Sequence, residues 1–109
     1  MLEVSEKDWK LFRAKLPDWQ EECMRKLGEE YIELLSSDEN PSEKFWKLEK
    51  RIKQDKRRTG VVCEVKRSLL FENLVSLINE DVICFDDLSD FSEDLKEAVK
   101  YVLDISRAD

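Results

Sequence analysis

Histidine is absent from this 109-residue chain, and glycine and proline occur only twice each. Without an imidazole, catalysis by cysteine–histidine pairs and serine–histidine–aspartate triads is excluded. Acid–base chemistry would fall to carboxylates, lysine or tyrosine. Sheet proteins of this size need many tight turns built from glycine, proline and asparagine, so the scarcity of turn residues argues against a β-rich fold.

Long apolar runs are also missing. The longest uninterrupted ones hold about four residues, as in Val82–Phe85, whereas a membrane-spanning helix needs roughly 20. The N-terminal residues Met1–Asp8 lack the basic start and apolar centre of a secretory signal. We therefore expect a cytoplasmic protein that does not associate with a membrane.

The three cysteines, Cys23, Cys63 and Cys84, are widely spaced and form no Cys-x-x-Cys pair. In a reducing compartment such residues are interpreted as small apolar fillers. No zinc-ligand spacing, calcium loop, glycine-rich phosphate loop or nucleophile elbow is visible. The carboxylates between Asp86 and Asp94 are interpreted as helix caps. We expect no metal site, no cofactor and no enzymatic activity.

What the chain does contain favours helices. Charged residues make up 41% and apolar residues another 41%, including three Trp, five Phe and two Tyr. This supply of large side chains suffices for one core, but not for two. The sequence predicts a single domain over 1–109, folded as an all-α, compact bundle of four to five helices.

The first half of the chain predicts three helices. Ser5 has the spacing of an N-cap, and Pro17 is expected to end or kink the helix that it opens. A second helix is expected over Asp18–Leu35, where Gly28 is interpreted as a site of close approach by a neighbouring helix. After a loop, Ser42 is expected to cap a third helix from about Glu43 to Arg57.

The second half is harder to assign. Val61–Val65 is β-branched and is compatible with a short strand, but it has no evident partner, so we expect a helix over about Val62–Asn79. Val82–Phe85 is expected to be a short, buried, extended segment. Asp86 or Asp87 is expected to cap a short helical turn, and Ser92 the last helix.

Apolar residues at helical spacing define the expected core. Its members are Trp9, Phe12, Leu16, Trp19, Leu27, Tyr31, Leu34, Phe45, Leu48, Ile52, Val65, Leu69, Leu74, Ile78, Ile83, Leu88, Phe91, Leu95, Val99 and Val102.

Charge is distributed unevenly along the chain, whose net charge is −7. Lys44–Arg67 holds ten basic residues against three acidic ones, and Glu72–Asp109 holds eleven acidic residues against three basic ones. A basic face beside an aromatic side chain is typical of phosphate and base contacts, although pairing with the acidic half is the simpler interpretation. The candidate interaction surface consists of Trp46, Lys47, Lys50, Arg51, Lys53, Arg57 and Arg58.

Two parts of the sequence carry a resemblance. Ser5–Phe12, continued by Leu16–Glu21, and the segment Asp86–Leu95 are similar to small uncharacterised helical proteins of bacteria. Some of these carry the label "multidrug transporter", which a chain without a membrane-spanning segment does not support. The resemblance implies a bacterial, cytoplasmic origin and no particular site.

These observations predict a small binding or regulatory protein that acts through a protein–protein surface, with an unknown protein or with itself. Trp46, Trp9 and Tyr101 are the expected anchors if they are exposed. The alternative is a nucleic-acid-associated protein that uses the basic Lys44–Arg67 face. This alternative is less favoured because the net charge is negative.

Overall fold

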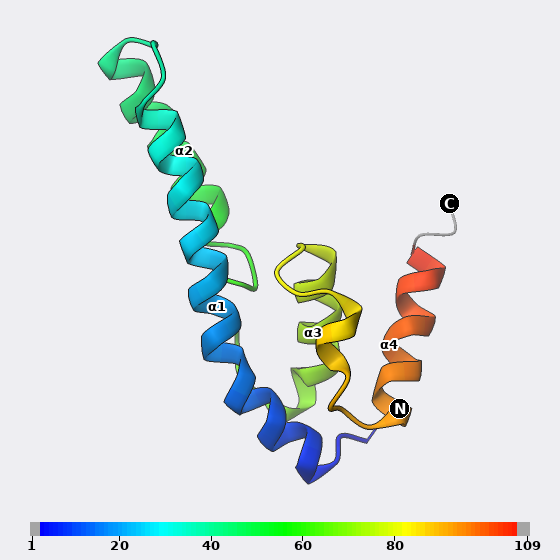
Figure 1. Ribbon diagram of the computed structural model, residues 1–109. Helices are drawn as coiled ribbons and strands as arrows, with labels where there is room; N and C mark the ends of the chain where they lie inside the picture. Colours follow the sequence, from blue (N-terminus) through cyan, green and yellow to red (C-terminus); the bar gives the residue numbers. More distant parts are fainter. Residues whose placement is uncertain (1–2, 107–109) are drawn as a thin grey trace.

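The structure, a computed structural model, describes residues 3–106 and consists of helices and their connections (Figure 1). In this range the α-helices are α1 (Glu6–Leu35), α2 (Pro41–Asp55), α3 (Leu70–Asn79) and α4 (Glu93–Ser106). Two 3-10 turns, η1 (Arg67–Leu69) and η2 (Phe85–Leu88), lie before α3 and α4. Because the described residues contain no β-strand, the all-α prediction is confirmed.

The molecule has two parts that share α1. Its first half packs with α3, η2 and α4, while its second half pairs with α2 in an antiparallel hairpin that projects from the rest (Figure 1). The radius of gyration is 16.7 Å, whereas a compact domain of this length is expected near 13 Å. The prediction of a compact bundle is therefore correct for the helices and only partly correct for the shape.

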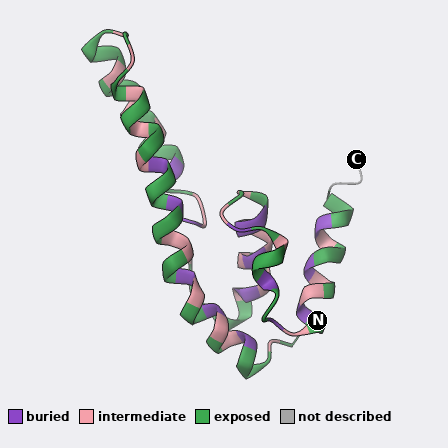
Figure 2. Cartoon of the chain, in the orientation of Figure 1, coloured by how far each residue is buried: buried purple, intermediate pink, exposed green. Residues whose placement is uncertain are grey.

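The hydrophobic core lies between the first half of α1 and the elements α3, η2 and α4 (Figure 2). Phe12 and Val99 are fully buried there, as expected. The prediction is wrong for Phe45, Ile52 and Val65, which are exposed. Phe45 and Ile52 belong to a helix that the core does not cover, and Val65 lies in a loop. The core cluster consists of Phe12, Leu16, Leu70, Leu74, Leu77, Ile78, Ile83, Leu88, Phe91, Leu95, Val99 and Leu103.

The expected break at Pro17 does not occur, since α1 runs continuously through this residue. Proline lacks an amide hydrogen, so the carbonyl of Arg13, one turn earlier, receives no hydrogen bond from it. Both residues are exposed, and water can satisfy that carbonyl. One long helix therefore replaces the two that the sequence suggested.

Two of the predicted helix caps are confirmed. The Oγ of Ser5 accepts the amide of Asp8 at 3.1 Å, and the Oγ of Ser92 accepts an amide of α4 at 3.3 Å. The expected cap at Ser42 is wrong, because α2 already begins at Pro41. Proline suits the first position of a helix, where its missing amide hydrogen leaves no bond unmade.

The helix expected over Val62–Asn79 forms only in its second part, as η1 and α3. Val61–Val65 is neither this helix nor the alternative strand, but a loop. Its backbone is held at two points. The amides of Val61 and Val62 bond to the carbonyl of Arg58, and the side chain of Asn73 donates to the carbonyl of Glu64 at 3.0 Å.

The distance that this loop must cover explains its conformation. It leaves Gly60, which lies against Cys23, and ends at Arg67, whose guanidinium pairs with Glu6 at 2.8 Å. These two points on α1 are separated by about 26 Å at 1.5 Å per residue. An extended chain from 60 to 67 covers about 23 Å, but a helix covers only about 10 Å. A helix over the whole connection would therefore be too short, and the chain forms a loop instead.

The extended segment expected over Val82–Phe85 is reduced to Cys84, because 82 and 83 form the bend that follows α3 and Phe85 begins η2. Two residues after the end of α3, Asp81 lies in the left-handed region, at φ 60°. The amide of Val82 donates to the carbonyl of Leu77 at 2.9 Å, and that of Asp81 to the carbonyl of Ile78 at 3.0 Å. This is a Schellman-type helix end, for which glycine is the usual signal. The sequence has aspartate there instead.

A buried carboxylate joins the starts of α1 and α4. Asp8 is only 2% exposed, and it accepts the backbone amide of Ser92 at 2.9 Å and the Ser92 hydroxyl at 2.6 Å. A negative group is favourable near the N-termini of both helices. Asp8 therefore fixes how α4 sits on α1.

We expect Asp8→Ala to lower the free energy of unfolding by about 2–3 kcal/mol, because Ser92 then keeps two part-buried donors without their acceptor. Urea denaturation followed by circular dichroism measures the change. Asp104→Ala is the matched control, since Asp104 is exposed on α4, and it should change stability by less than about 0.5 kcal/mol. Equal losses in the two variants would contradict this role of Asp8.

Candidate binding surface

A polar network holds α2 against α1. The Tyr31 hydroxyl donates to the carboxylate of Asp55, which is the one buried residue of α2. Arg51 lies over the Tyr31 ring at 5.6 Å from its centroid, 3.8 Å from Asp55, and donates to Glu30 at 2.9 Å. Burial and, second, the bond to Asp55 raise the pKa of Tyr31 to about 12. The network sets the register of the hairpin.

The base of the hairpin is fixed against the end of α3. Arg58 donates to the backbone carbonyl of Glu80 at 2.8 Å, and the amide and hydroxyl of Thr59 donate to the Glu80 carboxylate at 2.8 and 2.9 Å. A Cβ on Gly60 would lie 2.6 Å from the Sγ of Cys23, so this position requires glycine. The projecting hairpin is therefore anchored by several independent contacts.

The residues of the candidate interaction surface lie along α2 and the turn that follows it. They do not form one free basic face, since four of the cations have partners. Lys47 pairs with Glu39, Arg51 with Glu30 and Asp55, and Lys53 with Glu49, while Arg58 bonds to the carbonyl of Glu80.

Three cations of α2 and the turn that follows it remain available. Within the part of the chain that the structure describes, Lys50, Lys56 and Arg57 are exposed and have no carboxylate within 4.0 Å. Trp46, Lys50 and Arg57 recur at intervals of four and seven residues, so they share the outer side of α2 and the turn that continues it. The predicted basic face is therefore reduced to this stripe.

An apolar strip occupies a different side of the hairpin. On α1, Met24, Gly28, Ile32 and Leu35 recur at helical spacing, and on α2 Phe45 and Ile52 are seven residues apart. Met24, Gly28 and Ile52 line one shallow cavity of about 380 Å³ between the two helices, so the two rows meet. We call these six residues the apolar edge.

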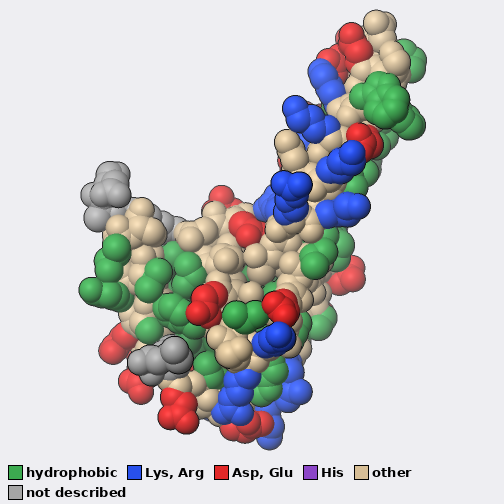
Figure 3. Space-filling model, turned by 180° about the vertical axis from the view of Figure 1, so that it is seen from behind, with side chains coloured by type: hydrophobic (Ala, Val, Ile, Leu, Met, Phe, Trp, Pro, Cys, Tyr) green, Lys and Arg blue, Asp and Glu red, His purple; other side chains and the backbone are tan. Residues whose placement is uncertain are grey.

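In Figure 3, hydrophobic side chains run along one margin of the projecting hairpin, and Lys and Arg side chains occupy its other margin and its middle. Five of the six residues have large exposed side chains, from 39% for Ile52 to 66% for Ile32. Contiguous apolar surface of this kind marks a binding site more often than scattered single residues do.

The three expected anchors differ in exposure. Trp46 is 63% and Tyr101 68% exposed, whereas Trp9 is half-buried against the core, with Arg13 over its ring at 5.1 Å. Trp46 packs edge-on against Phe45, with ring centroids 4.9 Å apart, at the far end of the hairpin. Tyr101 lines a separate groove of about 880 Å³ between η1 and α4.

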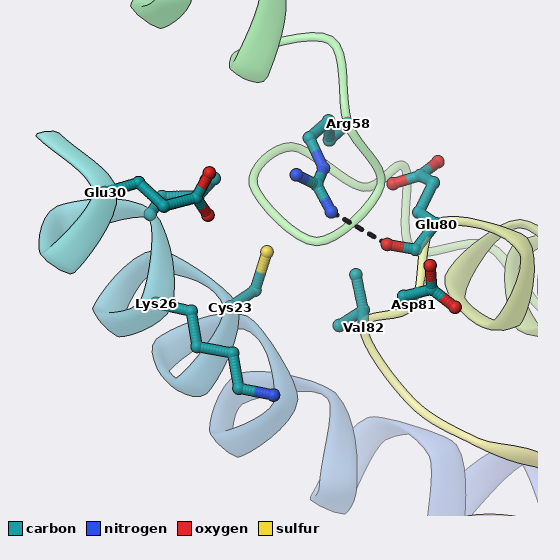
Figure 4. Close-up of a pocket in the computed structure, with 8 residues that line it drawn as sticks. Cys23, Lys26, Glu30, Arg58, Glu80, Asp81 and Val82 are labelled. Carbon is teal, nitrogen blue, oxygen red and sulfur yellow. Dashed lines mark hydrogen bonds between the residues drawn. The ribbon is translucent and has the colours of Figure 1, made fainter. Parts of the chain in front are cut away.

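A polar cavity of about 350 Å³ lies where the hairpin meets the core (Figure 4). Cys23 and Lys26 come from α1, Arg58 from the turn after α2, and Glu80 from the end of α3. Burial raises the pKa of the Cys23 thiol, and Arg58 only partly opposes this shift. The thiol therefore stays protonated and weakly nucleophilic at neutral pH. Arg58 and Glu80 are engaged in the contacts that close the junction, so we assign this cavity a structural role.

Two further properties concern the residues that the structure covers. Among them, no three carboxylates or thiols gather in an arrangement that could hold a metal ion. None of the helices in the range 3–106 combines the length and the apolar composition that crossing a membrane requires.

No protein-family model, curated protein or solved structure matches the chain. Function is therefore inferred from the surface of this chain alone.

We expect Gly60→Ala to destabilise the protein by about 1–3 kcal/mol, because its Cβ would overlap the side chains of Cys23 and Val82. Combining it with Cys23→Ala should restore part of the loss, which thermal denaturation of the two single variants and the double variant measures. The matched control is Gly28→Ala in dilute solution. No atom lies within 4 Å of a Cβ at this position, so a gain of up to about 1 kcal/mol is expected. A similar loss at both glycines would contradict the close approach at Gly60.

Tyr31→Phe should lower the free energy of unfolding by about 1–2 kcal/mol at neutral pH, since Asp55 loses a donor. The folded protein binds the phenolic proton with a pKa of about 12, above the unfolded value near 10. The stability that Tyr31 adds is therefore complete below about pH 10 and is lost as the pH rises towards 12. Urea denaturation of both proteins across this range should show their difference shrinking, and Tyr101→Phe serves as control. A difference that does not change with pH would contradict the buried Tyr31–Asp55 bond.

Proposed function

We propose that this chain is a small cytoplasmic protein-binding module, and that the apolar edge of the α1–α2 hairpin is its binding surface. The role is one of binding or regulation rather than catalysis. The hairpin presents the surface away from the core, as a preformed and rigidly anchored element.

The exposure of the apolar residues of α2 is the observation that carries this proposal. Phe45, Trp46 and Ile52 are 62%, 63% and 39% exposed, and the one buried residue of the helix is Asp55. A short helix in a protein normally draws its stability from burying an apolar face. Exposed aromatic side chains surrounded by charged ones are also the usual anchors of protein interfaces. A partner that covers these residues would supply the burial that α2 lacks.

Pre-organisation supports the same conclusion. The bonds of Tyr31 and Arg51 hold the two helices together, and the Thr59–Glu80 bonds fix the hairpin on the core. A surface that is ordered before binding loses less conformational entropy when a partner arrives. The hairpin therefore suits recognition of another helical surface.

Nucleic-acid binding is the second candidate. It is favoured by the exposed stripe of Trp46, Lys50 and Arg57, whose two cations have no carboxylate partner in the described range. It is disfavoured by the pairing of Lys47, Arg51 and Lys53 and by the net charge of −7. Binding of this kind would weaken steeply with salt and would be lost on charge reversal at Arg57 and Arg58.

Affinity capture from a lysate of cells that produce the protein tests the proposal. The wild type should retain a discrete partner that survives nuclease treatment, and Phe45→Ser should lose at least tenfold of it. Phe45 is exposed, so this substitution should leave the fold intact, which circular dichroism checks. Tyr101→Ser is the matched control, because it removes an equally exposed aromatic side chain far from the hairpin.

The outcomes separate the candidates. Retention of the same partner by Phe45→Ser would exclude the apolar edge as the surface. Loss of all partners on nuclease digestion, together with loss in Arg57→Glu, would move the function to the basic stripe.

A further inference from the structure

We infer that the apolar edge is occupied by a second copy of this chain, so that two hairpins pair as a four-helix bundle. The inference rests on the proposed function, in that both use the same edge, and it names the partner. Four observations support it: the incomplete helical layer, an unexplained glycine, the charges of the two helices, and the position of the core.

A hairpin of two helices forms a single layer, whereas a stable helical arrangement contains two layers packed against each other. Helices bury their apolar stripes against other elements on at least one face, yet here the edge formed by both helices faces outward. A second hairpin with the same edge provides a cover of equal length and composition. Two-fold pairing of identical surfaces is also the commonest way in which soluble proteins associate.

Gly28 points to a close neighbour that the single chain does not contain. It sits in the second half of α1, within the apolar edge, and a glycine inside a helix costs roughly 1 kcal/mol relative to alanine. We expected a helix of the same chain to approach it, but nothing lies within 4 Å of a Cβ built there. A helix of a second copy can approach the backbone at this point. Such an approach would explain why this position is a glycine.

The charges of the two helices select one pairing mode. Between Glu21 and Leu35, α1 holds five acidic and two basic residues, whereas Pro41–Arg58 holds three acidic and eight basic ones. A two-fold axis parallel to the hairpins places α1 of each copy against α2 of the other, which brings opposite charges together. An axis perpendicular to the helices would instead set α1 against α1. The first arrangement is favoured, with both hairpin tips at the same end of the bundle.

The globular part of the molecule leaves this edge free. At 100° per residue, the side of α1 that carries the core residues Phe12, Leu16 and Cys23 is rotated by about 135° from the side that carries its four residues of the apolar edge. The core packs on the first side. Two copies can therefore approach along the apolar edge without a collision between their cores.

The size of the contact sets its strength. α2 is 15 residues long, so the hairpin is about 22 Å long and roughly 20 Å wide. Such a footprint buries on the order of 1,000 Å² in total, which lies near the lower limit of specific interfaces. We therefore expect a reversible dimer with a dissociation constant on the order of micromolar, weakened by salt.

Sedimentation velocity of the full-length protein over a range of concentrations tests the inference. The wild type should shift from monomer to dimer. Ile32→Glu adds a charge at a side chain that is already 66% exposed, so it should fold normally and weaken dimerisation at least tenfold. Gly28→Leu should fold at least as stably as the wild type, because leucine is a better helix former, and should also dimerise at least tenfold more weakly. Tyr101→Ser should dimerise like the wild type.

Each other outcome has a definite meaning. A wild type that stays monomeric at every concentration overturns the inference, and so does a dimer that Ile32→Glu and Gly28→Leu leave intact. A dimer lost in Tyr101→Ser alone would place the contact in the groove beside α4. A monomer that still captures a partner through Phe45 would leave the proposed function standing and remove only the second copy.

Discussion

The architecture depends on a single constraint: α1 is one uninterrupted helix of 30 residues. At 1.5 Å per residue it extends about 45 Å, most of the longest dimension of the molecule, 52 Å. Its first half supplies Phe12 and Leu16 to the core, and its second half is the support on which α2 lies. A true break at Pro17 would uncouple the two parts. Because the carbonyl that loses its donor faces solvent, the helix continues and the hairpin projects.

The contacts around the middle of α1 fix the orientation of the projecting hairpin relative to the core. Gly60 lets the chain after α2 approach Cys23 closely, and Glu80 at the end of α3 receives both donors of Thr59. Farther along α1, the bonds from Tyr31 to Asp55 and from Arg51 to Glu30 hold α2 in place. These contacts link residues distant in sequence, so the hairpin is positioned by tertiary bonds rather than by the propensities of its own helices.

How far the sequence could predict this structure differs between elements. Helical spacing located Phe12, Leu74 and Val99 in the core, and the caps at Ser5 and Ser92 were read correctly from local chemistry. Local patterns could not show that α1 passes through Pro17, or that a helix over 61–66 would be too short to reach the anchor at Arg67. Apolar spacing shows which face of a helix is hydrophobic but not what covers it, so Phe45 and Ile52 were assigned to a core that does not reach them. The same limit hid the apolar edge, because two of its members, Phe45 and Ile52, have the spacing of core residues and Gly28 has that of a contact within the chain.

The uneven distribution of charge permits self-association that the net charge of the chain would disfavour. A chain of charge −7 is expected to repel its own copies, yet between Met24 and Arg58 there are ten basic and eight acidic residues, so the hairpin itself is close to neutral. The acidic excess belongs to the last third of the chain, Glu72–Asp109, whose described helices pack on the opposite side of α1 from the apolar edge. Charges separated by more than the screening length of about 8–10 Å at physiological salt interact weakly. Segregation of charge thus keeps the molecule strongly acidic while its projecting edge remains free to bind.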